Sequence, residues 1–161
     1  MFPQPGHDHA SCIASALRTA EALCRRRGAR LTAQRREVLE LVWSGHAPIG
    51  AYALLERMRE AGTRRPAPMT VYRALEFLQA HGLIHRIASL NAYVGCIAPG
   101  SGHGSQFLIC RSCHAVGEVH DEALDAALEQ VAADGGFRLD ETRVELEGLC
   151  QRCQARDDAH G

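Results

Sequence analysis

The sequence predicts an α+β protein with an N-terminal winged helix-turn-helix domain, a hinge and a small C-terminal α+β domain. Four segments in the first half repeat apolar residues near the helical period of 3.6, and two short β-prone runs follow them. The second half places one helical segment among further β-prone runs and carries two C-x-x-C pairs. Domains usually contain about 100–150 residues, so this chain of 161 residues can form one ordinary core or two small ones.

Each of the four expected helices has an apolar face and a start or stop signal. The first spans residues 12–27 and ends in three arginines, which suit the negative end of a helix dipole. Thr32 is a good N-cap for the second helix. The third spans about 50–60, and the fourth runs from Thr70 to Gly82.

A β-hairpin is expected directly after the helices. Residues 83–87 and 92–96 are β-prone runs separated by a turn at 88–91. Three or four helices followed by a hairpin is the element order of a winged helix-turn-helix. The glycine-rich stretch APGSGHGS at 98–105 comes next, and we expect it to act as the hinge.

The second half is expected to form a small α+β domain. Its β-prone runs cover 107–110, 116–120 and 137–147, and a helical segment covers 122–133. The winged-helix domain, with its leader and first helix, is therefore predicted over residues 1–97, the hinge over 98–106 and the C-terminal domain over 107–161.

The net charge of −1 conceals opposite charges in the two halves. Residues 1–95 contain 13 arginines against 7 acidic residues, whereas residues 96–161 contain 5 arginines against 12 acidic residues. A basic half joined to an acidic half favours a polyanion-binding module carried on a second domain with a different role. The alternative is that solvated helix faces happen to differ in sign.

The N-terminal residues and the cysteines bear on the compartment. The chain starts without a basic segment followed by an apolar run, and no apolar stretch approaches the roughly 20 residues that span a bilayer. We therefore expect a cytoplasmic protein with no membrane partner. Seven cysteines in a reducing compartment favour metal ligation or redox chemistry, and their odd number excludes a fully paired disulfide framework.

Two C-x-x-C pairs in the second half predict one zinc site. The pairs are Cys110 with Cys113 and Cys150 with Cys153, and four thiolates are the ligand set that tetrahedral zinc prefers. A single pair could equally be a redox site, but two pairs flanking one compact set of elements favour a shared ion. Because the protein would occupy all four positions, such a site is structural and joins the start of the domain to its end.

A second potential ligand set surrounds the hinge. It combines His85 in the first hairpin strand, Cys96 at the end of the second, His103 in the glycine-rich stretch and Glu118 on a later strand. Two imidazoles, a thiolate and a carboxylate are zinc-type ligands. Each residue alone is a weak signal, because a lone Cys is usually a small buried hydrophobe and a lone His or Glu usually lies at the surface. Weaker candidates are His120 and the leader residues His7, His9 and Cys12.

The helix expected from Thr70 is the candidate recognition helix. Its apolar stripe leaves Thr70 and Arg73 towards solvent, with Tyr72 at the border. An arginine in this position can donate two hydrogen bonds to guanine, and the helix N-terminus can meet a phosphate. Arg35 and Arg86 are candidate phosphate contacts. The alternative is that these are ordinary exposed side chains.

Several longer motifs extend across the chain from about residue 17 to residue 153. They read LTAQRREVLELV at 31–42, TVYRALEFLQAHGLIHRI at 70–87, NAYVGC at 91–96, and FLICRSCHAVGEV followed by GLCQRC. In order and spacing they resemble the ferric-uptake-regulator family of bacterial metal-sensing repressors, and most closely its zinc-sensing members.

The resemblance implies two zinc ions per chain. His85, Cys96, His103 and Glu118 would bind the regulatory ion, and the four cysteines of the C-x-x-C pairs would bind the structural one. The family's iron sensors usually carry a His-His-Asp-His-like run before the first C-x-x-C, where this chain reads GHGSQ at 102–106. Loss of the hard carboxylate and gain of a thiolate favour zinc over iron or manganese.

The resemblance also implies a function. Such a protein pairs through its C-terminal domain and, as a zinc-loaded homodimer, represses zinc uptake genes from a palindromic site in double-stranded promoter DNA. Tyr52 would contact a base methyl group and Arg73 would read a base. Glu56 and Arg59 lie where zinc-sensing relatives pair charges between adjacent dimers.

Three alternatives remain open. One is a sensor of the same family for iron, nickel or peroxide. Another is a zinc hydrolase or deaminase with Glu118 as general base, but the sequence has neither a His-Glu-x-x-His motif nor a His-x-Glu followed by Pro-Cys-x-x-Cys. The third is a zinc-buffering or purely structural module, which leaves the arginine-rich half unexplained. We expect no enzymatic activity and no small-molecule substrate other than zinc.

Overall fold

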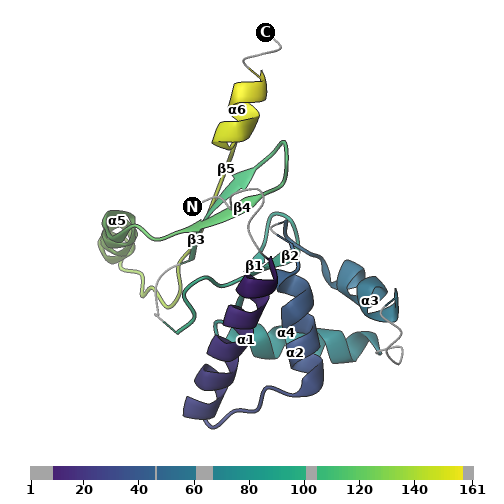
Figure 1. Ribbon diagram of the computed structural model, residues 1–161. Helices are drawn as coiled ribbons and strands as arrows, with labels where there is room; N and C mark the ends of the chain where they lie inside the picture. The colour runs from purple at the N-terminus through teal and green to yellow at the C-terminus, as the bar shows by residue number, and fades with distance from the viewer. Residues whose placement is uncertain (1–8, 46, 61–66, 101–104, 158–161) are drawn as a thin grey trace. The chain divides into compact units, whose positions relative to one another are not determined.

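The computed structural model describes residues 9–45, 47–60, 67–100 and 105–157 (Figure 1). The chain divides into two compact units, residues 4–101 and residues 102–161, the latter together with residues 1–3. The N-terminal unit contains helices followed by a hairpin, and the C-terminal unit contains a small sheet and two helices, which confirms the predicted α+β class. Within the described residues, no helix is both long and apolar enough to cross a bilayer.

The N-terminal unit begins with the four expected helices. They are α1 (His9–Arg26), α2 (Ala33–Trp43), α3 (Ala51–Glu60) and α4 (Pro68–Ala80). Helix α2 contacts each of the other three. The apolar faces of the helices form one core, in which Leu39 of α2 and Leu75 of α4 are almost completely buried.

Local signals explain where these helices begin and end. The Thr32 hydroxyl accepts a hydrogen bond from the backbone N–H of Arg35 at 3.4 Å and so caps α2 as predicted. Gly82 follows α4 with a φ of +65°, a conformation that favours glycine. Helix α4 starts at Pro68, before the predicted Thr70, because proline fits the first turn of a helix.

The predicted hairpin forms the wing. Strands β1 (Ile84–Ile87) and β2 (Ala92–Gly95) are antiparallel. The backbone of Ile49 adds a short third segment by exchanging two hydrogen bonds with Tyr93, at 2.9 and 3.0 Å. This bridge was not predicted, because a single paired residue leaves no periodic pattern in the sequence.

The C-terminal unit is built on a three-stranded sheet with the order β4–β3–β5. Strand β4 (Val116–Val119) is antiparallel to the central strand β3 (Ser105–Cys110), whereas β5 (Arg143–Gly148) is parallel to it. Helix α5 (Glu122–Asp134) connects β4 to β5, and helix α6 (Gln151–Asp157) follows β5.

Two expectations for this unit were wrong in detail. The strand predicted over 137–147 is confined to Arg143–Gly148, because β3 begins at Ser105, which pairs with Arg143. Phe137, at the start of the predicted strand, is 66% exposed. Helix α6 was not predicted, and the second C-x-x-C pair lies around its start.

Gln106 joins β3 to the start of α5. Its side chain is only 1% exposed, and its amide nitrogen donates to the Asp121 carbonyl at 3.1 Å and to Asp125 Oδ1 at 2.8 Å. Its Oε1 accepts from the backbone N–H of Asp121 at 3.1 Å. No residue of α5 is itself buried, so this polar anchor holds a helix whose apolar side chains stay accessible.

Candidate metal centres and nucleic-acid surface

The four cysteines of the C-x-x-C pairs converge in the C-terminal unit. Their Sγ atoms all lie within 4.8 Å of one another, and Cys113 Sγ is 3.8 Å from Cys150 Sγ. A tetrahedral ion with metal–sulfur bonds of about 2.3 Å has sulfur–sulfur edges of about 3.8 Å. The four cysteines therefore fit one zinc ion and leave it no coordination position for a further ligand.

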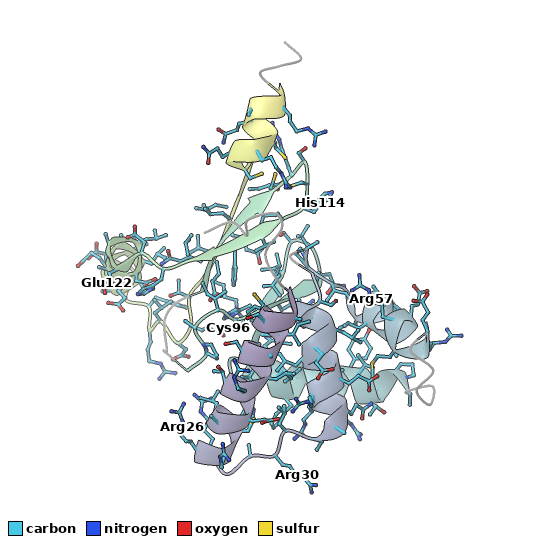
Figure 2. All side chains as sticks on the ribbon, in the orientation of Figure 1. Arg26, Arg30, Arg57, Cys96, His114 and Glu122 are labelled. Atoms are coloured by element: carbon cyan, nitrogen blue, oxygen red, sulfur yellow. The ribbon has the colours of Figure 1, made fainter. Side chains whose placement is uncertain are left out.

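The first pair is positioned by a tight turn after β3. Cys110 donates its backbone N–H to the Ala115 carbonyl at 3.0 Å, and the backbone N–H of His114 returns to the Cys110 carbonyl at 2.8 Å. To close this turn, His114 adopts a φ of +57°, which is uncommon for a residue with a Cβ. Figure 2 shows His114 on this loop, with its side chain exposed.

The second pair is positioned by α6. The backbone N–H of Cys150 donates to Cys110 Sγ at 3.4 Å, which brings the start of α6 against the end of β3. The backbone N–H of Cys153 donates to the Cys150 carbonyl at 2.9 Å, so one turn of chain presents both sulfurs to the same point. Cys110, Cys150 and Cys153 are buried and Cys113 is half-buried.

Hydrogen bonds prepare one of these sulfurs as a thiolate. Burial raises the pKa of Cys110, but three backbone N–H groups, that of Cys150 foremost, outweigh burial and lower the pKa to about 6. The pKa of Cys153 is lowered by a hydrogen bond from Ser112, yet burial and the three neighbouring sulfurs raise it to about 11. A metal ion would have to displace the proton that Cys153 retains.

Arg152 belongs to this centre although it was not singled out from the sequence. Its side chain hydrogen-bonds Cys113, and this bond, with the attraction of the thiolates, raises the pKa of Arg152. A hydrogen bond to the backbone of Ala115 also lowers the pKa of Cys113, which favours the thiolate that Arg152 contacts. A zinc ion with four thiolates carries net negative charge, which the guanidinium partly offsets. The only sign of this role in the sequence is the position of Arg152 between the two cysteines of the second C-x-x-C pair.

Two of the predicted regulatory ligands lie together on the wing. His85 is on β1, and Cys96 follows β2 directly, with its backbone N–H donating to the Leu83 carbonyl at 3.1 Å. This strand pairing brings a ring nitrogen of His85 and Sγ of Cys96 within 4.8 Å of each other. Cys96 is buried and His85 is half-buried, and the two side chains can reach one ion.

The other two predicted regulatory ligands belong to the C-terminal unit. Glu118 lies on β4 opposite Phe107 and is buried. His103 lies outside the described residues. Among the weaker candidates, His120 is exposed and its ring lies 3.5 Å from Asp125, whereas His7 and the side chain of His9 lie outside the described residues.

The predicted base-reading residues lie on the two helices that follow α2. Tyr52 on α3 is 78% exposed, and Arg73 on α4 is also exposed. Thr70 is half-buried, and Tyr72 packs against the core. No side chain caps the N-terminus of α4; Pro68 has no N–H group and the Thr70 N–H donates to the Ala67 carbonyl at 2.8 Å, so the helix dipole, more than free N–H groups, would attract an anion there.

The two candidate phosphate contacts differ in how they are held. Arg86 is exposed on β1 and donates to Asn91 Oδ1 at 2.8 Å. Arg35 is half-buried: it donates to the Arg30 carbonyl at 2.6 Å, and its guanidinium carbon lies 3.5 Å from the centre of the Phe77 ring. Arg35 therefore also has a packing role. Glu56 and Arg59 are both exposed on α3.

A winged-helix unit with an exposed arginine on its fourth helix, together with a sheet unit that gathers four thiolates, defines a metal-binding winged-helix protein. The chain belongs to the ferric uptake regulator family, whose model matches residues 26–147.

Relatives within that family include zinc regulators. The chain is 41% identical to the zinc uptake regulation protein of Escherichia coli (strain K12) over 138 residues, which cover 85% of this chain and 80% of the relative. It is 30% identical to the zinc uptake regulation protein of Mycobacterium tuberculosis (strain ATCC 25618 / H37Rv), with 80% and 97% covered. A solved zinc uptake regulator complexed with zinc and DNA is similar with a TM-score of 0.85 and 39% identity, and the match covers 91% of this chain and 97% of that one.

Proposed function

We propose that this protein is a zinc-responsive transcriptional repressor of zinc uptake genes, active as a zinc-loaded homodimer on a palindromic site in promoter DNA. The observation that carries the proposal is the pairing of His85 with Cys96 at the end of the wing, because a thiolate beside an imidazole is a zinc-type donor set. The similarity to a regulator solved with zinc and DNA supports it. Access to the chromosome places the protein in the cytoplasm.

The proposal assigns two zinc ions to each chain. The closed four-cysteine centre would hold the structural ion, which supplies folding energy and no catalytic position. His85, Cys96, His103 and Glu118 would hold the regulatory ion. Neither ion would take part in a reaction, so the protein acts by binding alone.

The regulatory ion would couple the two predicted domains. Two of its ligands come from the wing, His103 comes from the predicted hinge, and Glu118 comes from the predicted C-terminal domain. An ion held by all four would restrict the angle between the domains, and few angles place both recognition helices of a dimer in successive major grooves. Shifting the ratio of DNA-binding-competent to incompetent conformations from 1:99 to 99:1 requires that zinc bind the competent form more tightly by about 5.5 kcal/mol, which zinc–thiolate sites can supply.

The DNA contacts would divide into base reading and positioning. Arg73 can donate a bidentate pair to guanine, and Tyr52 can pack against a thymine methyl group. Thr70 and Tyr72 lie beside Arg73 at the start of α4, where the helix N-terminus can meet a phosphate. For phosphate contacts, Arg86 is already exposed, whereas Arg35 would exchange its bond to the Arg30 carbonyl.

The C-terminal unit offers an apolar surface for pairing. Val131 on α5 is 70% exposed, Phe137 follows that helix and is 66% exposed, and Leu146 on β5 is 50% exposed. Accessible apolar side chains on both a helix and a strand of a small unit are typical of an interface. Homodimerisation through this unit would present two recognition helices with two-fold symmetry. Exposed Glu56 and Arg59 would pair charges between adjacent dimers.

A DNA-binding titration at buffered free zinc tests the proposal. The fluorescence anisotropy of labelled promoter DNA from a zinc-importer gene should rise with zinc, and Cys96→Ser should abolish the response while the protein keeps its structural ion. Cys24→Ala is the matched control, because Cys24 is buried in the helical core and should not affect the response. An unchanged zinc response in Cys96→Ser would refute the assignment.

The same titration separates zinc sensing from a related activity. Under anaerobic conditions, iron(II) should promote DNA binding only at much higher free-metal concentrations than zinc does, because thiolate ligands prefer zinc to iron(II). A lower threshold for iron or nickel would identify a sensor of that metal. Loss of binding with peroxide in the presence of iron only would identify a peroxide sensor.

A further inference from the structure

A cavity in the N-terminal unit is lined by two of the chain's seven cysteines. Its volume is about 210 Å³, and it lies between α1 and the end of the wing. Cys12, Ser15 and Thr19 of α1 line one side, while Trp43 and Cys96 line the other. Figure 2 shows Cys96 beside the first turns of α1. Cys12 and Cys96 are both thiols and are not linked in a disulfide.

We infer that Cys12 and Cys96 are a reversible disulfide pair, which closes across this cavity when an oxidant acts on the protein without regulatory zinc. The inference rests on the proposed function, because it assigns a means of regulation to the zinc ligand Cys96. The sequence offers Cys12 only as a weaker candidate metal ligand, and the cavity gives it a different partner.

Formation of the bond would draw the first turns of α1 towards the end of the wing. A disulfide requires its Cα atoms to approach within about 7 Å. None of the residues 10–16 is fully buried: Ile13 is half-buried against the core, and Leu17 is the first buried side chain of α1. A helix end with no fully buried side chain opens at a lower cost than the buried part of the same helix.

The chemistry balances with a peroxide as oxidant. Peroxide first oxidises the thiol of Cys12, the more accessible of the two, to a sulfenic acid and releases one water. The sulfur of Cys96 then attacks that sulfur, which forms the S–S bond and releases a second water. Two electrons pass from the two thiols to the peroxide. A low-molecular-weight thiol such as glutathione reverses the step by thiol–disulfide exchange.

The remaining cysteines are poorer partners for Cys12. Cys24 is 1% exposed in the helical core, and burial raises the pKa of its thiol, which disfavours the reactive thiolate. The other four sulfurs gather in the C-terminal unit, where the structural zinc would hold them. Among the described residues that line the cavity, Cys96 is the only cysteine besides Cys12.

The disulfide would oppose zinc loading. Bonded to Cys12, the Cys96 sulfur is no longer a thiolate and cannot bind zinc with the affinity of the reduced site. Zinc bound to Cys96 would in turn protect that sulfur. Oxidation would therefore hold the protein in its zinc-free state, and repression would be relieved even when zinc is available.

The test uses the full-length protein, loaded at the structural site but stripped of regulatory zinc, and treated with hydrogen peroxide. Peptide mapping by mass spectrometry should find a Cys12–Cys96 link, which reducing agent removes and added zinc prevents. Trp43, the only tryptophan of the chain, lines the cavity, so its fluorescence should change on oxidation and recover on reduction. The oxidised protein should bind one zinc fewer per chain.

Cys12→Ser should remove the link, the fluorescence change and the loss of zinc binding, while its zinc affinity before oxidation stays within about twofold of the parent. Cys24→Ala should behave like the parent. The inference is overturned if Cys12 links to another cysteine or another chain, or if Cys12→Ser loses zinc binding on oxidation as the parent does. If the reduced parent shows no zinc-dependent DNA binding, the proposed function fails instead, whatever the mapping finds.

Discussion

The indole of Trp43 packs directly onto the backbone of Gly95, so closely that a Cβ at position 95 would overlap the ring. Trp43 ends α2, and Gly95 ends β2, one residue before Cys96. The contact therefore fixes the end of the wing against the helical core. It also sets the place from which Cys96 projects.

Gly95→Ala should destabilise the N-terminal unit, because the methyl group cannot fit unless the indole or β2 shifts. Overpacking of this kind costs about 1–3 kcal/mol in the free energy of unfolding. Denaturant unfolding followed by Trp43 fluorescence measures the effect. Gly45→Ala is the matched control, since an added Cβ there meets no atom within 4 Å, and its stability should change by less than about 0.5 kcal/mol. Equal effects of the two substitutions would contradict the packing argument.

His114→Gly should stabilise the metal centre. The φ of +57° at His114 strains a residue that has a Cβ, and the side chain is exposed, so its loss removes little packing. Relief of about 1–2 kcal/mol of strain, partly offset by the entropy of glycine in the unfolded chain, predicts a gain of up to about 1 kcal/mol. Thermal unfolding of the zinc-loaded protein measures it. His114→Val should destabilise, and a stable valine variant would show that the turn relaxes freely.

Gln106→Glu should loosen α5 while preserving the shape of the side chain. The substitution replaces an amide that donates to Asp125 with an oxygen that cannot donate when ionised, and it places two carboxylates together. We expect a loss of about 2–3 kcal/mol and faster amide hydrogen exchange throughout α5. Protonation at low pH should restore part of the loss, since a neutral glutamic acid can donate again. Gln130→Glu is the control, because Gln130 is an exposed side chain that makes a similar bond to Asp134. Its exchange should stay close to that of the parent.

Acid should release zinc from the four-cysteine centre, and Arg152 should lower the pH at which this release occurs. The folded pKa of Cys110, about 6, is depressed below the ordinary thiol value of about 8.5. The stability contributed by this thiolate is therefore complete above the ordinary value and is lost as the pH falls through about 6. Arg152→Ala removes the guanidinium that favours the thiolate of Cys113, so zinc release, followed with a chromophoric chelator, should shift to higher pH. Arg111→Ala, in the spacer of the other pair, should leave the release midpoint unchanged. A shift of equal size in both variants would show that general charge, not the bond to Cys113, is responsible.

Patterns within single segments predicted much of the fold and the metal centre. The helices have apolar periodicity and capping residues such as Thr32, and hydrophobic burial and hydrogen bonding act on such patterns locally. The four cysteines were predictable for a similar reason, because their number and spacing match the coordination of one ion.

Contacts between segments far apart in the chain could not be predicted in this way. The bridge between Ile49 and Tyr93 and the fit of Trp43 onto Gly95 depend on how separate elements pack, and no sequence period records such packing. Arg152 was missed because a charged spacer residue is common in any sequence, and its contact with Cys113 is visible only in the folded centre.

The sequence by itself determined the order of the elements up to β5, the family likeness and the identity of the potential zinc ligands, because these depend on local periodicity and ligand chemistry. Tertiary structure alone decided that β5 pairs in parallel with β3, that α5 is held by the buried Gln106, and that Cys12 and Cys96 line one cavity. Each of these follows from the close packing of surfaces brought together only when the chain folds.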